Sequence, residues 1–201
     1  MADSKRVSVE QNENRSVYVT IAAYLVVLLL LALIVFISAP FGDFLGTDQF
    51  AFASGVHGLL ATLGLIVGSV SLYLGWRLFI GKIKAFADLK ILLLLSTLAV
   101  FGTIIFGNWI YIAYRAPGGV RAYLLQNYPE IHNVFFEFKE FIALFTFPLF
   151  LAATYVVWRY SNHLINNKPL RTWTFVVISI AWIALMIAFI LGAAITKIKS
   201  V

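Results

Sequence analysis

Long apolar stretches separated by short polar segments dominate the pattern of the chain. Five of these stretches reach the length of about 20 residues that an α-helix needs to cross about 30 Å of hydrocarbon. They predict transmembrane helices near residues 17–38, 53–79, 91–113, 134–158 and 173–195. A polar tail, residues 1–16, precedes the first stretch, and no repeat or linker is visible. We therefore expect an all-α, polytopic integral membrane protein whose single domain, residues 17–201, is a five-helix bundle.

The composition agrees with a membrane protein. Hydrophobic residues make up 62% of the 201 residues and charged residues only 12%, against about 45–50% and about 25% in a soluble domain. A soluble fold of this length cannot bury so much apolar surface, so the excess is expected to face the lipid bilayer. The chain has no cysteine, which excludes disulfides, thiolate metal sites, thiol catalysis and covalent haem attachment.

The basic residues indicate topology and no nucleic-acid partner. The net charge is +6, but the lysines and arginines stand at the ends of apolar runs and form no patch interleaved with aromatic residues. Ten of them flank one side of the predicted helices, and only Arg115, Arg121, Lys197 and Lys199 flank the other. Because positive loops stay inside, we expect a cytoplasmic N-terminus and an external C-terminus. The expected location is the plasma membrane of a prokaryote.

The predicted helix 53–79 carries a stripe of small residues. Residues three or four apart share one helix face, and such faces let membrane helices approach each other closely. His57 lies in the middle of the stripe, so its ring is expected to face protein and not lipid. The stripe consists of Ser54, His57, Ala61, Gly64, Gly68, Ser71 and Gly75.

Three charged residues stand where the predicted helix 134–158 begins. At about 100° per residue, Glu137 and Glu140 share a face, while Lys139 lies on another. The two carboxylates would repel each other unless a proton, a cation or a metal lies between them. A lysine at a membrane boundary usually extends to the interface, which is the simplest expectation for Lys139. Pro148 is expected to kink the helix and widen the outer half of the bundle.

Residue counting places His57 at the height of Glu137 and Glu140. Each lies about twenty residues, or roughly 30 Å, from the cytoplasmic arginine of its own helix. The first hypothesis is therefore a non-haem metal site in which His57, Glu137 and Glu140 bind iron, copper or zinc. In the plainer alternative, His57 is a core histidine bonded to a backbone carbonyl, and the glutamates extend to the interface.

The second hypothesis is a single b-type haem. His57 and His132 would be its axial ligands, because the two parallel helices that carry them are expected to lie diagonally in the bundle. Arg115 and Arg121 would pair with the haem propionates, since guanidinium binds carboxylate in a bidentate manner. His132 is also explained as a plain interfacial residue.

These residues favour a membrane redox protein that holds a haem or a metal near the outer face and takes part in electron transfer. A quinol, or another membrane redox subunit, is the expected partner. Two alternatives remain open. One is a non-catalytic transmembrane subunit of a respiratory or photosynthetic complex. The other is a proton- or cation-coupled transporter with Glu137 and Glu140 as its titrating pair. A hydrolase is disfavoured because the chain has no nucleophile motif and no His-Glu-x-x-His.

Overall fold

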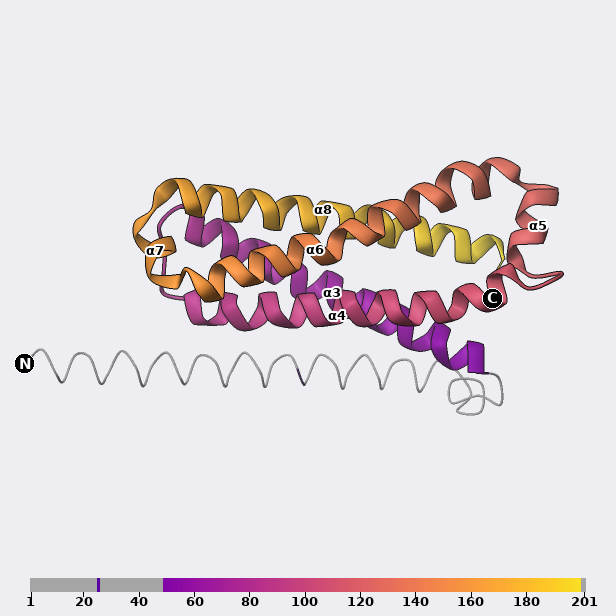
Figure 1. The fold of residues 1–201 in the computed structure, drawn as a ribbon, viewed down its shortest axis with the longest axis horizontal. Helices are drawn as coiled ribbons and strands as arrows, with labels where there is room; N and C mark the ends of the chain where they lie inside the picture. The colour runs from indigo at the N-terminus through magenta and orange to yellow at the C-terminus, as the bar shows by residue number, and fades with distance from the viewer. Residues whose placement is uncertain (1–24, 26–48, 200–201) are drawn as a thin grey trace, which may run out of the picture.

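The structure, a computed structural model, describes residue 25 and residues 49–199 of the chain (Figure 1). Every regular element in this part is helical. The predicted tail and first span lie outside the described residues, apart from Leu25, so the count of five spans stays a prediction. The elements are α3 (Gln49–Phe79), α4 (Phe86–Arg115), α5 (Val120–Asn127), a π-helix η1 (Ile131–Phe136), α6 (Glu137–Arg159), α7 (Ser161–Asn166) and α8 (Lys168–Ile198).

Four of the predicted spans are confirmed as long apolar helices. By length and composition, the segments Phe50–Phe79, Phe86–Arg115, Ile131–Arg159 and Lys168–Ile198 can each cross a membrane. Each is slightly longer than the sequence pattern predicts, because the helices continue into the polar flanks where the apolar signal ends. The orientation of the chain across the membrane stays a prediction.

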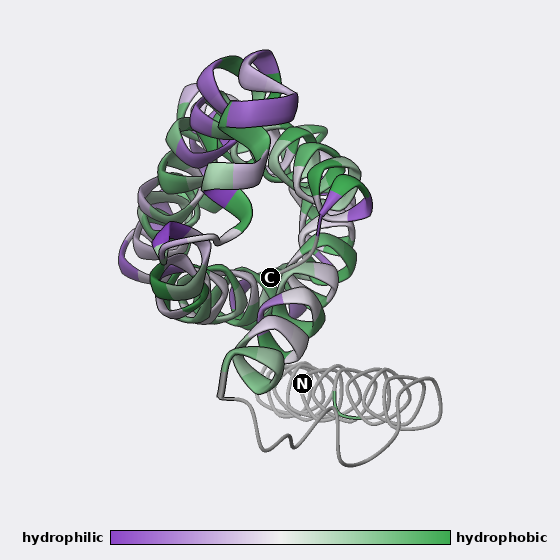
Figure 2. Ribbon diagram, turned by 90° about the vertical axis from the view of Figure 1, so that its right-hand side faces the viewer, coloured by the Kyte–Doolittle hydropathy of each residue, from purple (hydrophilic) through white to green (hydrophobic). Residues whose placement is uncertain are grey.

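The four long helices form a closed ring. α3 packs against α4 and α8, and α6 packs against the same two helices. α3 and α6 therefore lie diagonally, as the sequence predicts for the helices that carry His57 and His132. Viewed end-on, the helices surround a central axis (Figure 2). We call the end that carries α5 the α5 end and the opposite end, where α7 lies, the α7 end (Figure 1).

The half of the bundle toward α7 is tightly filled. Phe150, Leu89, Leu93 and Ile178 are fully buried and belong to one apolar cluster. The small-residue stripe of α3 supports this packing. A Cβ atom added at Gly75 would lie only 3.1 Å from Ile178 Cδ1, so α8 could not approach α3 so closely past a larger residue. The prediction that the stripe faces protein is confirmed.

Hydroxyl and indole groups link neighbouring helices. The hydroxyls of Thr97 on α4 and Thr154 on α6 lie 2.9 Å apart and are both buried. Trp182 Nε1 of α8 donates to Ser69 Oγ of α3 over 2.9 Å. Polar contacts of this kind hold membrane helices together where the lipid provides no hydrophobic driving force. They fix which helix faces meet.

Large apolar side chains cover the outside of the ring. A soluble monomer rarely exposes such a contiguous apolar surface, whereas lipid tails solvate it without cost. The outward distribution therefore agrees with a lipid-embedded bundle. Examples more than 45% exposed are Tyr73, Leu98, Ile112, Phe141, Trp173 and Ile190.

Candidate functional site

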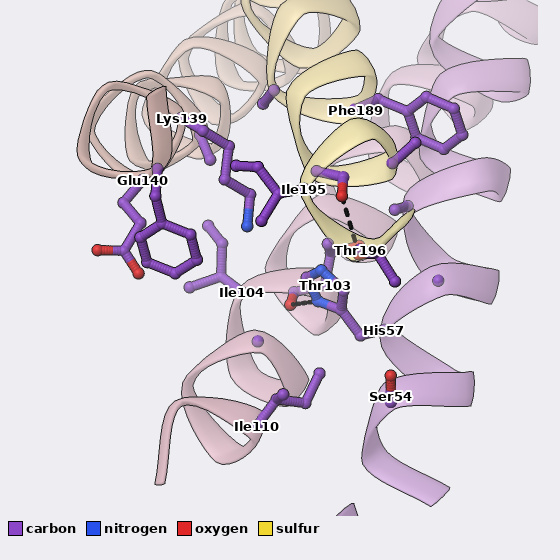
Figure 3. Close-up of a pocket in the computed structure, with 18 of the residues that line it drawn as sticks. Ser54, His57, Thr103, Ile104, Ile110, Lys139, Glu140, Phe189, Ile195 and Thr196 are labelled. Carbon is purple, nitrogen blue, oxygen red and sulfur yellow. Dashed lines mark hydrogen bonds between the residues drawn. The ribbon is translucent and has the colours of Figure 1, made fainter. Parts of the chain in front are cut away.

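A cavity of about 700 Å³ lies inside the half of the bundle toward α5. All four long helices contribute to its wall, which is mostly apolar or small (Figure 3). Its size is within the range of about 300–1,000 Å³ that is typical of small-molecule sites, which combine apolar walls with a few polar groups. The polar groups on this wall include Ser54, His57, Thr103, Asn108, Lys139 and Glu140.

His57 faces the cavity from α3. Its Nδ1–H donates to the backbone carbonyl of Thr103 on α4 over 2.8 Å, because a carbonyl oxygen can only accept. In the neutral ring this bond leaves the Nε2 lone pair available as an acceptor. Gly107, one turn further along α4, makes room for the ring: a Cβ atom there would lie 3.1 Å from His57 Cε1. The predicted inward orientation is confirmed, together with the bond to a backbone carbonyl that the plainer alternative expects.

Lys139 enters the same cavity from α6, the helix diagonally opposite α3. It does not extend to the interface; its ammonium points toward the interior (Figure 3). The Nζ atom lies 5.4 Å from the centre of the Phe136 ring, a cation–π contact. Gly192 of α8 leaves space for the stem, since a Cβ atom there would lie 3.5 Å from Lys139 Cε.

Glu140 also lines the cavity, whereas Glu137 is exposed and lies off its wall. Tyr111 Oη donates to Glu140 Oε2 over 3.2 Å. The same phenol accepts a bond of 2.8 Å from Arg115 Nη2, and the guanidinium carbon lies 4.5 Å from the centre of its ring. Arg115, Tyr111 and Glu140 thus form a chain of polar groups from the surface to the cavity.

His132 is buried in an aromatic cluster and does not line the cavity. Its Nδ1 is hydrogen-bonded to Tyr114 Oη at 2.7 Å. The Tyr114 ring stacks on Phe136 at 4.3 Å with only 3° between the planes. Both of these aromatic residues do line the cavity. They therefore lie between it and His132, which is only 4% exposed.

The described residues do not assemble either predicted cofactor set. Among residues 49–199, no three histidine or acidic side chains lie close enough together to hold a metal ion. Of the four proposed haem contacts, only His57 lines the cavity, while Arg115 and Arg121 are exposed. The haem and the metal therefore stay predictions.

The sequence pattern missed the partners that give the cavity its shape. The pattern predicts Lys139 at the interface. It gives no sign that Gly107 and Gly192 make room for ionisable side chains. These contacts are visible only in the structure, because each glycine lies on a different helix from the side chain it accommodates. No sequence periodicity reports such a pairing.

Comparison of the chain with protein-family models, curated proteins and solved structures found no match. The geometry and chemistry of the cavity therefore carry the functional proposal.

Proposed function

We propose that the protein is a membrane redox protein that binds a lipid-soluble quinol or quinone in the cavity toward α5 and takes part in electron transfer. The observation that carries this proposal is the pairing of His57 and Lys139. The two side chains reach one apolar cavity from diagonally opposite helices. A ligand that bridges them needs polar atoms on opposite edges and an apolar body.

The ring of a quinone has this distribution of polar atoms. One of its two oxygens can accept a hydrogen bond from the Lys139 ammonium. In the reduced quinol, the opposite hydroxyl can donate to the Nε2 atom of His57, whose other nitrogen is held by Thr103. The bond at Nδ1 fixes the orientation of the ring and leaves Nε2 as an acceptor. The neutral body of the ligand then lies against apolar wall.

The wall matches the remainder of such a molecule. Phe136 and Phe189 provide aromatic surface, and Ala143, Ala188 and Ala193 provide smooth apolar surface. A volume of about 700 Å³ is large enough for a ring with the first part of its tail. The rest of the tail would extend into lipid, from which a quinol reaches the site without crossing water.

Electron transfer requires a second redox group. The sequence predicts a haem or a metal centre, which would supply one-electron redox chemistry when bound. This chain would then supply the quinol site.

The direct test is quinone binding by the purified full-length protein in detergent. Solvent extraction and a reduced-minus-oxidised ultraviolet spectrum would detect quinone that is carried through purification. Titration with a short-chain quinone, followed by equilibrium dialysis, would measure affinity and stoichiometry. We expect one saturable site per chain. We expect His57→Leu to weaken quinol binding about fivefold, because a neutral hydrogen bond contributes about 1 kcal/mol.

His163→Leu is the matched control, because His163 lies on α7 at the opposite end of the bundle and off the cavity. Its affinity for the quinol should equal that of the unchanged protein. The proposal fails if no quinone is extracted and the titration shows no saturable binding. It also fails if the two histidine variants lose affinity equally.

A further inference from the structure

We propose that Lys139 makes the cavity a site that stabilises the one-electron-reduced quinone, the semiquinone anion. This inference rests on the proposed quinone site and assigns a role to one residue in it. Quinone and quinol are both neutral, whereas the intermediate between them carries a negative charge. A fixed cation in an apolar cavity therefore discriminates between them.

Contacts with neighbouring residues hold the Lys139 side chain in position. Its ammonium lies over the Phe136 ring, and its stem passes Gly192 of α8. The side chain starts in the first turn of α6 and points toward the interior of the bundle (Figure 3). The charge is thus held at the cavity wall by aromatic and backbone contacts on two helices.

Within the described part of the chain, no carboxylate forms an ion pair with this ammonium. Glu140 is the next residue, but its side chain turns away from Lys139 (Figure 3) and accepts the Tyr111 hydroxyl instead. His57, which lines the same cavity, brings no negative charge to it. Glu140 attracts the ammonium only at a longer range than an ion pair, and a charge withdrawn from water without a bonded counter-charge is costly. The cavity therefore favours a ligand that brings negative charge.

The chemistry balances without any oxidant beyond the quinone itself. One quinone and one quinol react to give two semiquinone anions and two protons, with one electron passing from the quinol to the quinone. The Lys139 ammonium donates a charge-assisted hydrogen bond to the oxygen that carries the anion. Such bonds are about twice as strong as those between neutral groups. The interaction is strongest in the intermediate, which is the condition for lowering its free energy selectively.

A long-chain carboxylate could place its anion on the same ammonium. It could not also bond to the free Nε2 of His57, because a carboxylate has no hydrogen to donate. A quinol or semiquinone uses both groups. Competition between oleate and the quinone serves as a further arm of the test.

The experiment is a redox titration of the quinone-loaded, full-length protein in detergent, in which electron paramagnetic resonance measures the free-radical signal. We expect a radical at intermediate potentials in the unchanged protein. Lys139→Met should lower the semiquinone stability constant about 10- to 100-fold, the range for loss of a charge-assisted bond. Affinity for the neutral quinone should change much less. Lys139→Arg, which keeps the charge, should retain most of the radical.

Lys168→Met is the matched control, because Lys168 is an exposed lysine at the α7 end of α8 and lies off the cavity. It should leave the radical unchanged. Should Lys139→Met fail to fold, Lys139→Gln tests the same loss of charge in a polar side chain.

The outcomes separate the inference from the proposed function. If the unchanged protein binds no quinone, or if oleate binds and quinone does not, the proposed function fails. If quinone binds but the radical is absent, or is equally strong in Lys139→Met, the role of Lys139 is refuted and the quinone site stands. Loss of the radical in Lys139→Met with binding retained supports both.

Discussion

Replacing Gly107 by alanine tests the positioning of His57 without touching the imidazole itself. The added Cβ atom would lie 3.1 Å from His57 Cε1 and 3.2 Å from Nδ1. The ring must yield by a few tenths of an ångström, because the backbone of α4 is less free to move than a side chain. That shift lengthens the bond of 2.8 Å to the Thr103 carbonyl and displaces Nε2.

Two terms of similar size oppose each other in the stability of this variant. Alanine in place of a helical glycine stabilises by roughly 0.5–1 kcal/mol. Weakening one hydrogen bond costs about 0.5–1.5 kcal/mol. We therefore expect the free energy of unfolding to change by less than about 1 kcal/mol. Quinol affinity should fall by about fivefold, because the misplaced Nε2 loses its bond to the ligand, worth about 1 kcal/mol.

Gly64→Ala is the matched control for this effect. Its added methyl group meets Ala99 and Val100 at 3.7 Å, an ordinary contact distance, and no histidine. Unfolding in detergent, followed by circular dichroism, measures stability, and equilibrium dialysis with a short-chain quinol measures affinity. If Gly107→Ala and Gly64→Ala retain the same affinity, the ring of His57 does not contribute to the site as argued.

Three further substitutions test the packing and the site. Thr154→Val removes the 2.9 Å hydrogen bond to Thr97. It should lower the free energy of unfolding by about 0.6 kcal/mol, and by at most about 1.7 kcal/mol. Thr174→Val loses only a hydrogen bond within α8 and should destabilise less. Gly68→Leu should destabilise by about 1–3 kcal/mol, since Phe150 and Trp182 lie 3.4 Å from its Cβ position. Gly58→Leu, with nothing within 4 Å, should not destabilise. Gly192→Val should displace the stem of Lys139 and weaken the radical signal while quinone still binds; an unchanged radical would contradict the contact.

The helices were predictable because lipid leaves the chain few choices. An apolar run of about twenty residues must satisfy its backbone internally, so it becomes a helix. The same logic located His57, since a polar ring on a stripe of small residues has its lowest free energy against protein. Counting along the helices places His57, Glu137 and Glu140 at one height, and of these His57 and Glu140 line the cavity.

The direction in which Lys139 points could not be predicted in this way. Projection at 100° per residue places His132 and Lys139 on one face, because they are seven residues apart. The π-helix η1, Ile131–Phe136, intervenes. A π turn closes over five residues and so rotates everything after it relative to what precedes. His132 is consequently buried against Tyr114, while Lys139 points into the cavity. No residue pattern in the segment predicts the π-helix.

The location of the cavity follows from the sizes of the side chains along the bundle. Toward α7, large residues such as Phe150 and Leu93 fill the axis. Toward α5, small residues on all four long helices line the cavity, including Gly58, Gly107, Ala143 and Ala193. A space of this size between the described helices forfeits dispersion contacts along its lining unless it is filled, and this lining also holds an ammonium and an imidazole. An occupant with an apolar body and two polar edges, such as the proposed quinone, would satisfy both demands at once.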